Sequence, residues 1–171
     1  MIIKDSHLEK LVKEHDTFFS ILIYGPNEGL VKDQVDKIVK NYLVQDECEK
    51  ISLNGKELDS DPQTLEDLTR SVSMFYKSKV VIASDIKDKH LKLVEDVIFN
   101  EPDRVFLIFR EGNLNKSSKI RKFFESNEKC YSLPCYEDDG RSMIRNLEEF
   151  IKKNNLELNH DTKNYLLQSL S

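Results

Sequence analysis

The chain has 171 residues, of which 33% are charged, and its formal net charge is −5. This length suits one domain of ordinary size or one domain with part of another, and no apolar stretch approaches the roughly 20 residues that a membrane span needs. The first residues lack the basic start and apolar centre of an export signal, so we expect a cytoplasmic protein without a membrane anchor. The acidic balance argues against an electrostatic nucleic-acid binder over the whole surface, while a local basic patch stays compatible with it.

The residues that usually hold metals or form disulfides are scattered. Three cysteines, Cys48, Cys130 and Cys135, are an odd number without C-x-x-C spacing, and the four histidines have no acidic or cysteine partners at ligand spacing. We therefore expect ordinary thiols, no metal ion and no cofactor.

Apolar, strand-forming runs alternate with amphipathic segments along the first 133 residues. Strands are expected at 18–24, 50–53, 79–83, 104–109 and 130–133, with helices at 30–43, 61–74 and 91–99 between them. The runs KVVIAS and VFLIF are apolar at nearly every position, as in strands that helices cover on both faces. The alternation predicts an α/β fold, a three-layer sandwich around a parallel sheet of five strands.

The first strand leads into ILIYGPNEGLVKD, which has the outline of a phosphate-binding loop between a strand and a helix. Counting G-x-x-x-x-G-K-[ST] from Gly25 places Leu30 at the second glycine, Val31 at the lysine and Lys32 at the magnesium-binding hydroxyl. Glu28 would also compete with a phosphate for the helix N-terminus. The sequence predicts a degenerate loop that keeps the shape and binds no nucleotide.

An α/β sandwich with such a loop, followed by helices, has the layout of the AAA+ ATPases. A working Walker B strand would end in Asp-Glu, but here Asp85 is followed by Ile86, so we expect Asp85 to be a cap or turn residue. VFLIFREGN offers no clearly placed polar sensor, and no arginine-finger motif precedes the later helices. The whole catalytic set is missing.

The pattern changes after Pro134. Asp138, Asp139 and Gly140 form a helix start before an apolar stripe, and a second helix is expected from about Asp161. Two helices of this size bury little by themselves. We expect residues 1–136 to form the AAA+-like domain and residues 137–171 to be the truncated start of a small helical second domain.

Four stretches, taken together and in order, resemble the delta subunit family of bacterial DNA polymerase III, the clamp-loader subunit that opens the sliding clamp. They are LIYGPNEGLVKDQVDKI, RSVSMFYKSKVVIASD, EPDRVFLIFREGNLNKSSKIRKFFE and LPCYEDDGRSMIRNLEEFIKK. The resemblance implies an AAA+-like first domain that does not hydrolyse ATP, a helical second domain and a third, collar domain that assembles the loader. It also implies a noncatalytic subunit of a DNA polymerase holoenzyme, a nucleotidyltransferase complex that meets primed DNA as an assembly. Because no collar follows residue 171, we expect the chain to be monomeric.

The resemblance also assigns the clamp-binding residues. In the family, two adjacent large apolar residues at a helix end insert into a hydrophobic pocket of the clamp (the beta subunit), and Met74 and Phe75 match them, with Ser73 and Tyr76 on either side. In a regular helix over 61–74, Met74 falls opposite the apolar stripe and therefore lies in water. Phe75 lies at the margin of the stripe, so a core position against KVVIAS stays open.

Basic residues gather in LNKSSKIRKFF. Lys116, Lys119, Arg121 and Lys122 could contact DNA phosphates or a neighbouring subunit, and the alternative is a solvated helix face. Ser118 is expected to cap the helix that follows.

Two other function classes compete with the clamp-loader interpretation. A nucleotide-dependent phosphotransferase or NTPase with an atypical loop would bind nucleotide, which the present motifs do not favour. A response-regulator-like switch would need acids at the end of the first strand, and IYGPN supplies none.

Overall fold

The computed structural model describes residues 1–14, 18–45, 48–71 and 73–136, together with scattered residues between 147 and 166. The chain divides into two compact units, Met1–Cys135 and Tyr136–Ser171. Each unit is considered by itself.

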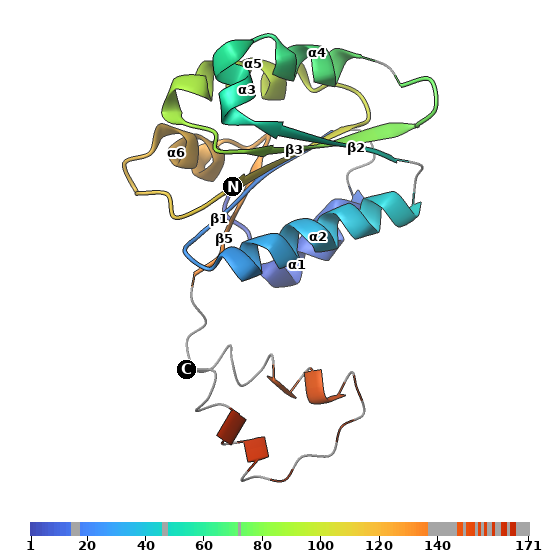
Figure 1. Cartoon of the computed structure of the whole chain (residues 1–171), viewed down its shortest axis with the longest axis vertical. Helices are drawn as coiled ribbons and strands as arrows, with labels where there is room; N and C mark the ends of the chain where they lie inside the picture. The colour runs from blue at the N-terminus through green and yellow to red at the C-terminus, as the bar shows by residue number, and fades with distance from the viewer. Residues whose placement is uncertain are drawn as a thin grey trace. The chain divides into compact units, whose positions relative to one another are not determined.

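The first unit is built on a five-stranded, wholly parallel sheet in the order β2-β3-β4-β1-β5 (Figure 1). The strands are β1 (Phe18–Tyr24), β2 (Cys48–Asn54), β3 (Ser78–Ser84), β4 (Val105–Glu111) and β5 (Tyr131–Pro134). Every predicted strand is confirmed, each within two residues of its expected ends. The predicted parallel α/β sheet of five strands is therefore correct.

Helices cover both faces of this sheet (Figure 1). One face carries α1 (Asp5–Glu14) and α2 (Glu28–Gln45), and the other carries α3 (Gly55–Ser60), α4 (Thr64–Arg70), the short η1 (Asp88–His90), α5 (Leu91–Asn100) and α6 (Lys119–Ser126). The three-layer arrangement follows from the apolar stripes of these helices, each of which needs a sheet face to bury it.

Two apolar clusters form the core, one between the sheet and each helical layer. Along β1, Ile21 and Ile23 belong to the cluster under α1 and α2, whereas Leu22 and Tyr24 belong to the opposite cluster. This is the alternation of a strand with both faces covered. Each of these four side chains is at most 1% exposed.

The helix predicted over residues 61–74 is wrong at both ends, because α4 spans only Thr64–Arg70. A separate helix, α3, precedes it and begins after Asn54. The Asn54 side chain accepts a hydrogen bond from Lys56 N at 2.9 Å, and the Glu57 side chain accepts one from Asn54 N at 2.6 Å. This N-x-x-E capping box was overlooked in the sequence. Helix α4 ends at Arg70, because Ser71 adopts an extended backbone with φ −67° and ψ 131°. Helix α1 was also not predicted.

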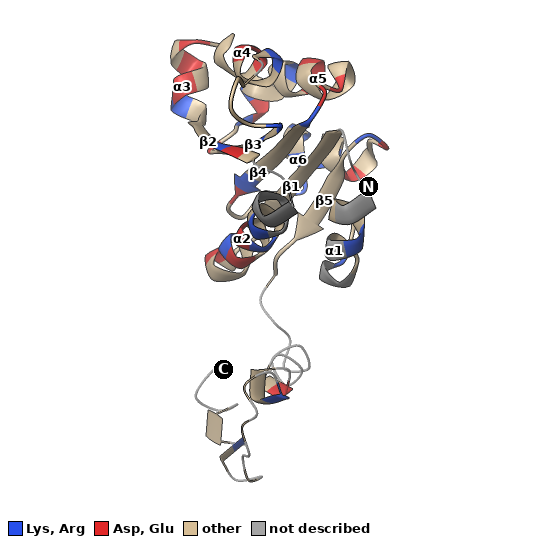
Figure 2. Cartoon of the chain, turned by 90° about the vertical axis from the view of Figure 1, so that its right-hand side faces the viewer, with Lys and Arg blue, Asp and Glu red and all other residues tan. Residues whose placement is uncertain are grey.

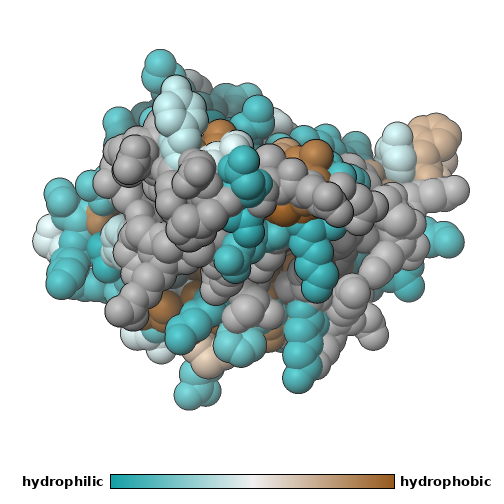
Figure 3. All heavy atoms as spheres, turned by 90° about the horizontal axis from the view of Figure 1, so that it is seen from below, coloured by the Kyte–Doolittle hydropathy of each residue, from teal (hydrophilic) through white to brown (hydrophobic). Residues whose placement is uncertain are grey.

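In the second unit, the described residues at 147–148, 150–152, 162–163 and 165–166 are helical. The start predicted at residues 138–140 lies outside the described residues. Within the described part of the chain, no helix is long and apolar enough to span a membrane. Among the coloured residues in Figure 3, hydrophilic side chains outnumber hydrophobic ones.

Candidate protein-interaction site

The loop after β1 is short and already capped. Only Gly25, Pro26 and Asn27 separate β1 from α2. Asn27 accepts hydrogen bonds from Leu30 N through its side chain at 2.9 Å and from Val31 N through its carbonyl at 3.0 Å. The Leu30 amide is thus capped by the Asn27 side chain, as at an ordinary helix N-terminus.

Gly25 serves the packing of the chain that leaves β5. Cys135 N donates to Tyr24 O at 2.6 Å, and Gly25 N donates to Gly112 O at 3.1 Å. A Cβ atom at residue 25 would lie 1.8 Å from the Cys135 carbonyl oxygen. The glycine is required by this close approach, independently of any ligand.

The position of the missing lysine faces the core. Val31 is 3% exposed and belongs to the cluster between α2 and the sheet, while Lys32 is exposed. A lysine at residue 31 would bring its charge into an apolar layer. The local geometry matches the replacement of the phosphate-binding residue by a core residue.

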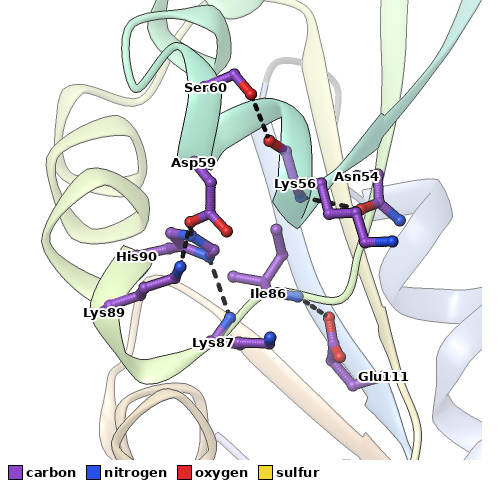
Figure 4. A network of polar contacts seen from close by, with 9 residues as sticks. All are labelled: Asn54, Lys56, Asp59, Ser60, Ile86, Lys87, Lys89, His90 and Glu111. Carbon is purple, nitrogen blue, oxygen red and sulfur yellow. Dashed lines mark hydrogen bonds and ion pairs between the residues drawn. The ribbon is translucent and has the colours of Figure 1, made fainter.

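Acidic side chains surround the adjoining cavity at the carboxyl ends of β3 and β4. This cavity of about 260 Å³ is lined by Glu28, Asp85 and Glu111, with Arg110 as its cation. Burial, which the Ile86 amide opposes and the Asp85 charge reinforces, raises the pKa of Glu111 to about 7. Its carboxylate accepts a hydrogen bond from Ile86 N at 2.7 Å (Figure 4). Three acidic side chains against one arginine make this cavity unfavourable for the bare phosphates of a nucleoside triphosphate.

Asp85 is a turn residue, as the sequence predicted. Its backbone is left-handed, with φ 56°, and its carboxylate accepts a hydrogen bond from Asn54 Nδ2 at 2.8 Å. The neighbouring turn is held by His90, which contacts Asp59 Oδ1 at 2.8 Å and accepts from Lys87 N at 3.1 Å (Figure 4). Hydrogen bonds from Lys89 and then His90 lower the pKa of Asp59.

The four basic residues in LNKSSKIRKFF do not share one environment. Lys116, Lys119 and Lys122 are exposed. Arg121 is buried, donates to Glu125 at 2.8 Å and to Leu114 O at 2.9 Å, and lies 4.9 Å above the ring of Tyr24. Arg121 therefore stabilises the fold of the first unit.

Acidic groups also lie near these basic residues. Ser118 caps α6, as predicted, and the Asp88 carboxylate accepts hydrogen bonds from Lys119 N at 2.9 Å and Ile120 N at 3.2 Å. The helix N-terminus is thereby filled by a protein carboxylate. Acidic and basic side chains are also interspersed along α2 (Figure 2).

The segment 73–76 lies at the opposite end of the sheet, just before β3. Met74 is 93% exposed, Phe75 84% and Tyr76 46%. The Ser73 hydroxyl accepts hydrogen bonds from Phe75 N at 3.4 Å and Tyr76 N at 3.3 Å, which turns the chain. The core position considered for Phe75 is therefore wrong, and Met74 is exposed because the helix has ended, not because of its phase within a helix.

Lys79 ties this segment to α4, a role that the sequence analysis missed. It is 6% exposed, and its ammonium donates to Leu68 O at 3.2 Å, to Ser71 Oγ at 2.6 Å and to Ser71 O. A cation at these carbonyls completes the C-terminal end of α4. The exposed segment thus begins and ends at fixed points, Ser71 and β3. The sequence signal for this role is Lys79 itself, a single charged residue near the start of an otherwise apolar strand.

Beside the segment lies a cavity of about 550 Å³. Ser73 and Tyr76, the residues on either side of Met74 and Phe75, line it together with Arg104 from the turn before β4. Since β3 and β4 are neighbouring parallel strands, the turns that precede them lie side by side at the amino ends of the strands. Two exposed apolar side chains next to a cavity are suited to docking against another protein.

The sequence profile of the family described as "DNA polymerase III, delta subunit" matches residues 21–133. The chain belongs to this family. The matched range contains both the loop after β1 and the segment 73–76.

Individual relatives agree with the family. The chain is 26% identical over 151 residues to a probable DNA polymerase III subunit delta of Rickettsia prowazekii (strain Madrid E), which covers 86% of this chain and 44% of the relative. A Bacillus subtilis DNA clamp loader delta protein (YqeN) superposes with a TM-score of 0.58 at 12% identity, over 95% of this chain and 51% of that chain. The chain therefore spans about half the length of the relatives it matches.

A second solved structure shows the same fold in another protein. Domain III of the Thermotoga maritima replication initiation protein DnaA gives a TM-score of 0.53 at 15% identity, over 95% of this chain and 73% of that chain. At such identities the likeness concerns the fold alone, which is AAA+-like.

Among the residues that the structure describes, no group of three or more histidine, cysteine, aspartate or glutamate side chains could hold a metal ion.

Proposed function

We propose that this chain is a noncatalytic clamp-loader subunit that binds the sliding clamp through residues 73–76 and helps to open it for loading onto primed DNA. Met74 and Phe75 insert into a hydrophobic pocket of the clamp, with Ser73 and Tyr76 flanking them. Residues 1–136 form the clamp-binding domain. Other loader subunits of the holoenzyme, which act in the cytoplasm, hydrolyse ATP while this chain holds the clamp.

The exposure of Met74 and Phe75 carries the proposal. Methionine adapts its shape to a pocket and phenylalanine fills one rigidly, so the pair suits a preformed apolar socket. Keeping both side chains in water has no benefit for the fold of this chain. The Ser73 turn and the Lys79 contacts hold the segment in place, which lowers the entropy lost on binding.

Support for the noncatalytic part comes from the carboxyl ends of the strands. Asn27 caps the helix, Val31 occupies the lysine position within the core, and Glu28, Asp85 and Glu111 line the adjoining cavity. We propose that this loop is a retained element of the fold. The alternative of an NTPase or phosphotransferase would need a lysine on the β- and γ-phosphates, and Val31 stands at that position.

A direct binding titration tests the proposal. The chain is titrated with the purified sliding clamp of the same organism by calorimetry, alongside the double variant Met74→Ala/Phe75→Ala. Truncating a buried anchor costs about 2 kcal/mol or more, so the double variant should lose about thirtyfold in affinity or more. Its melting temperature should stay within about 2 °C, because both side chains are exposed in the free chain.

Equal clamp affinity of the wild type and the double variant would remove this segment from the interface. A control is Phe99→Ala, which truncates a phenylalanine that is 52% exposed and lies on α5. This variant should bind the clamp as the wild type does.

A further inference from the structure

The cavity beside residues 73–76 is strongly basic in a chain whose formal net charge is −5. Four cationic residues line it, Arg70, Lys77, Lys79 and Arg104, against one carboxylate, that of Asp103. A concentration of one charge sign in a concave site raises the local concentration of ligands of the opposite sign. The same chain has an acidic cavity at the other end of its sheet.

The four cations differ in the hydrogen bonds and ion pairs that they already make within the chain. Lys79 is buried and committed to the end of α4, and Arg70 pairs with Glu66 at 2.8 Å. The Arg104 side chain is 60% exposed, and its Nε lies 3.9 Å from Asp103 Oδ2, which is the outer limit for an ion pair. Lys77 is exposed and has no ion pair within the ranges that the structure describes. Lys77 and Arg104 are therefore the cations available to a ligand.

Ammonium and guanidinium groups form strong, charge-assisted hydrogen bonds with carboxylates. The exposed cations of this cavity, Lys77 and Arg104, therefore fit an acidic ligand.

We infer that this cavity receives an acidic side chain of the same protein that takes up Met74 and Phe75, so the apolar socket of the clamp is bordered by at least one carboxylate. Lys77 and Arg104 attract it and pair with it. The inference rests on the proposed function, because it names the chemistry of the clamp surface at the same site. The apolar pair supplies most of the affinity, while the cavity supplies orientation and speed of association.

Charge reversal with a matched control tests this inference. The double variant Lys77→Glu/Arg104→Glu should bind the clamp about tenfold more weakly at low salt, mainly through slower association. Raising the salt concentration should shrink this difference, because the charges are screened. The control, Lys56→Glu/Lys92→Glu, changes the net charge equally with two exposed lysines at the other end of the sheet, and should bind like the wild type.

The variant Ser78→Ala is a second control inside the cavity lining. Alternation along β3 places its hydroxyl on the face of the sheet under α2, so this variant should bind the clamp as the wild type does. If both double charge variants weaken binding equally, only net charge matters and the inference fails. If Lys77→Glu/Arg104→Glu binds like the wild type while Met74→Ala/Phe75→Ala does not bind, the inference fails and the proposed function stands.

Discussion

The two ends of the parallel sheet differ in charge and in exposed apolar surface. Open α/β sheets usually bind their ligands at the carboxyl ends of the strands. Here those ends carry a loop capped by Asn27, the buried Val31 and an acidic cavity, whereas the amino ends of β3 and β4 carry the exposed segment 73–76 and a basic cavity. Under the proposed function, this fold keeps its architecture while its functional surface lies at the opposite end of the sheet.

The largest effect is expected when the lysine of the phosphate-binding motif is restored at residue 31. Replacing Val31 by lysine restores one phosphate-binding group but puts a longer side chain into the apolar cluster between α2 and the sheet, next to the acidic cavity. We expect a loss of about 2 to 3 kcal/mol in the free energy of unfolding, because the cluster is overpacked even where the carboxylates of the cavity pair with the ammonium. Chemical denaturation measures it. Lys32→Ala, an exposed neighbour on the same helix, should change stability by less than about 0.5 kcal/mol.

A second test concerns the close approach at Gly25. The variant Gly25→Ala should lose about 2 kcal/mol or more, because its Cβ would overlap the Cys135 carbonyl and displace the chain after β5. Gly112→Ala is the matched control, since a Cβ there meets no atom within 4 Å. Equal melting temperatures of the two variants would contradict the packing role assigned to Gly25.

The buried carboxyl group gives a pH-dependent test at the carboxyl ends of the strands. The pKa of Glu111 rises from its ordinary value of 4.5 to about 7 in the folded chain, so the folded state binds this proton more tightly than the unfolded state does. Its contribution to stability is full below about pH 4.5 and is lost as the pH rises through about 7.

Glu111→Gln keeps an acceptor for Ile86 N and removes this titration. Relative to the wild type, the variant should gain about 1 to 3 kcal/mol between pH 5 and pH 8. Denaturation at the two pH values measures the gain. Glu128→Gln, which is exposed, should show no such change, and a flat difference for Glu111→Gln would refute the assigned pKa.

For nucleotide binding we expect no measurable effect. Titration of the chain with magnesium and ATP should give no saturable heat at micromolar concentrations, because cap, core residue and carboxylates occupy the phosphate site. Saturable binding that a change at Lys32 abolishes would show that the carboxyl ends of the strands are still functional, and would favour the NTPase interpretation.

The sequence predicted the sheet well because its strands are buried on both faces, so their apolar runs are nearly unbroken. It predicted the end of α4 poorly, because Ser71 turns the chain with the help of Lys79, and the sequence does not show that these residues meet. Met74 and Phe75 came from the family resemblance, while the helical argument for their exposure was wrong.

Two features of the candidate site depend on contacts between separate segments. Glu111 is buried only because the turn after β3 folds over it and Ile86 donates to it. The basic cavity arises because Lys77 and Arg104 precede strands that are neighbours in the sheet but lie 27 residues apart in the chain, as their numbers show. Neither can be read from local periodicity.

Hydrogen exchange of the chain with and without the sliding clamp tests the central claim most directly. We predict that the clamp slows amide exchange in residues 73–79 and leaves residues 25–32 and 85–90 unchanged, because binding occurs at the amino ends of β3 and β4. Protection of residues 25–32 or 85–90 with no change in residues 73–79 would contradict the account, since it would return the functional surface to the carboxyl ends of the strands.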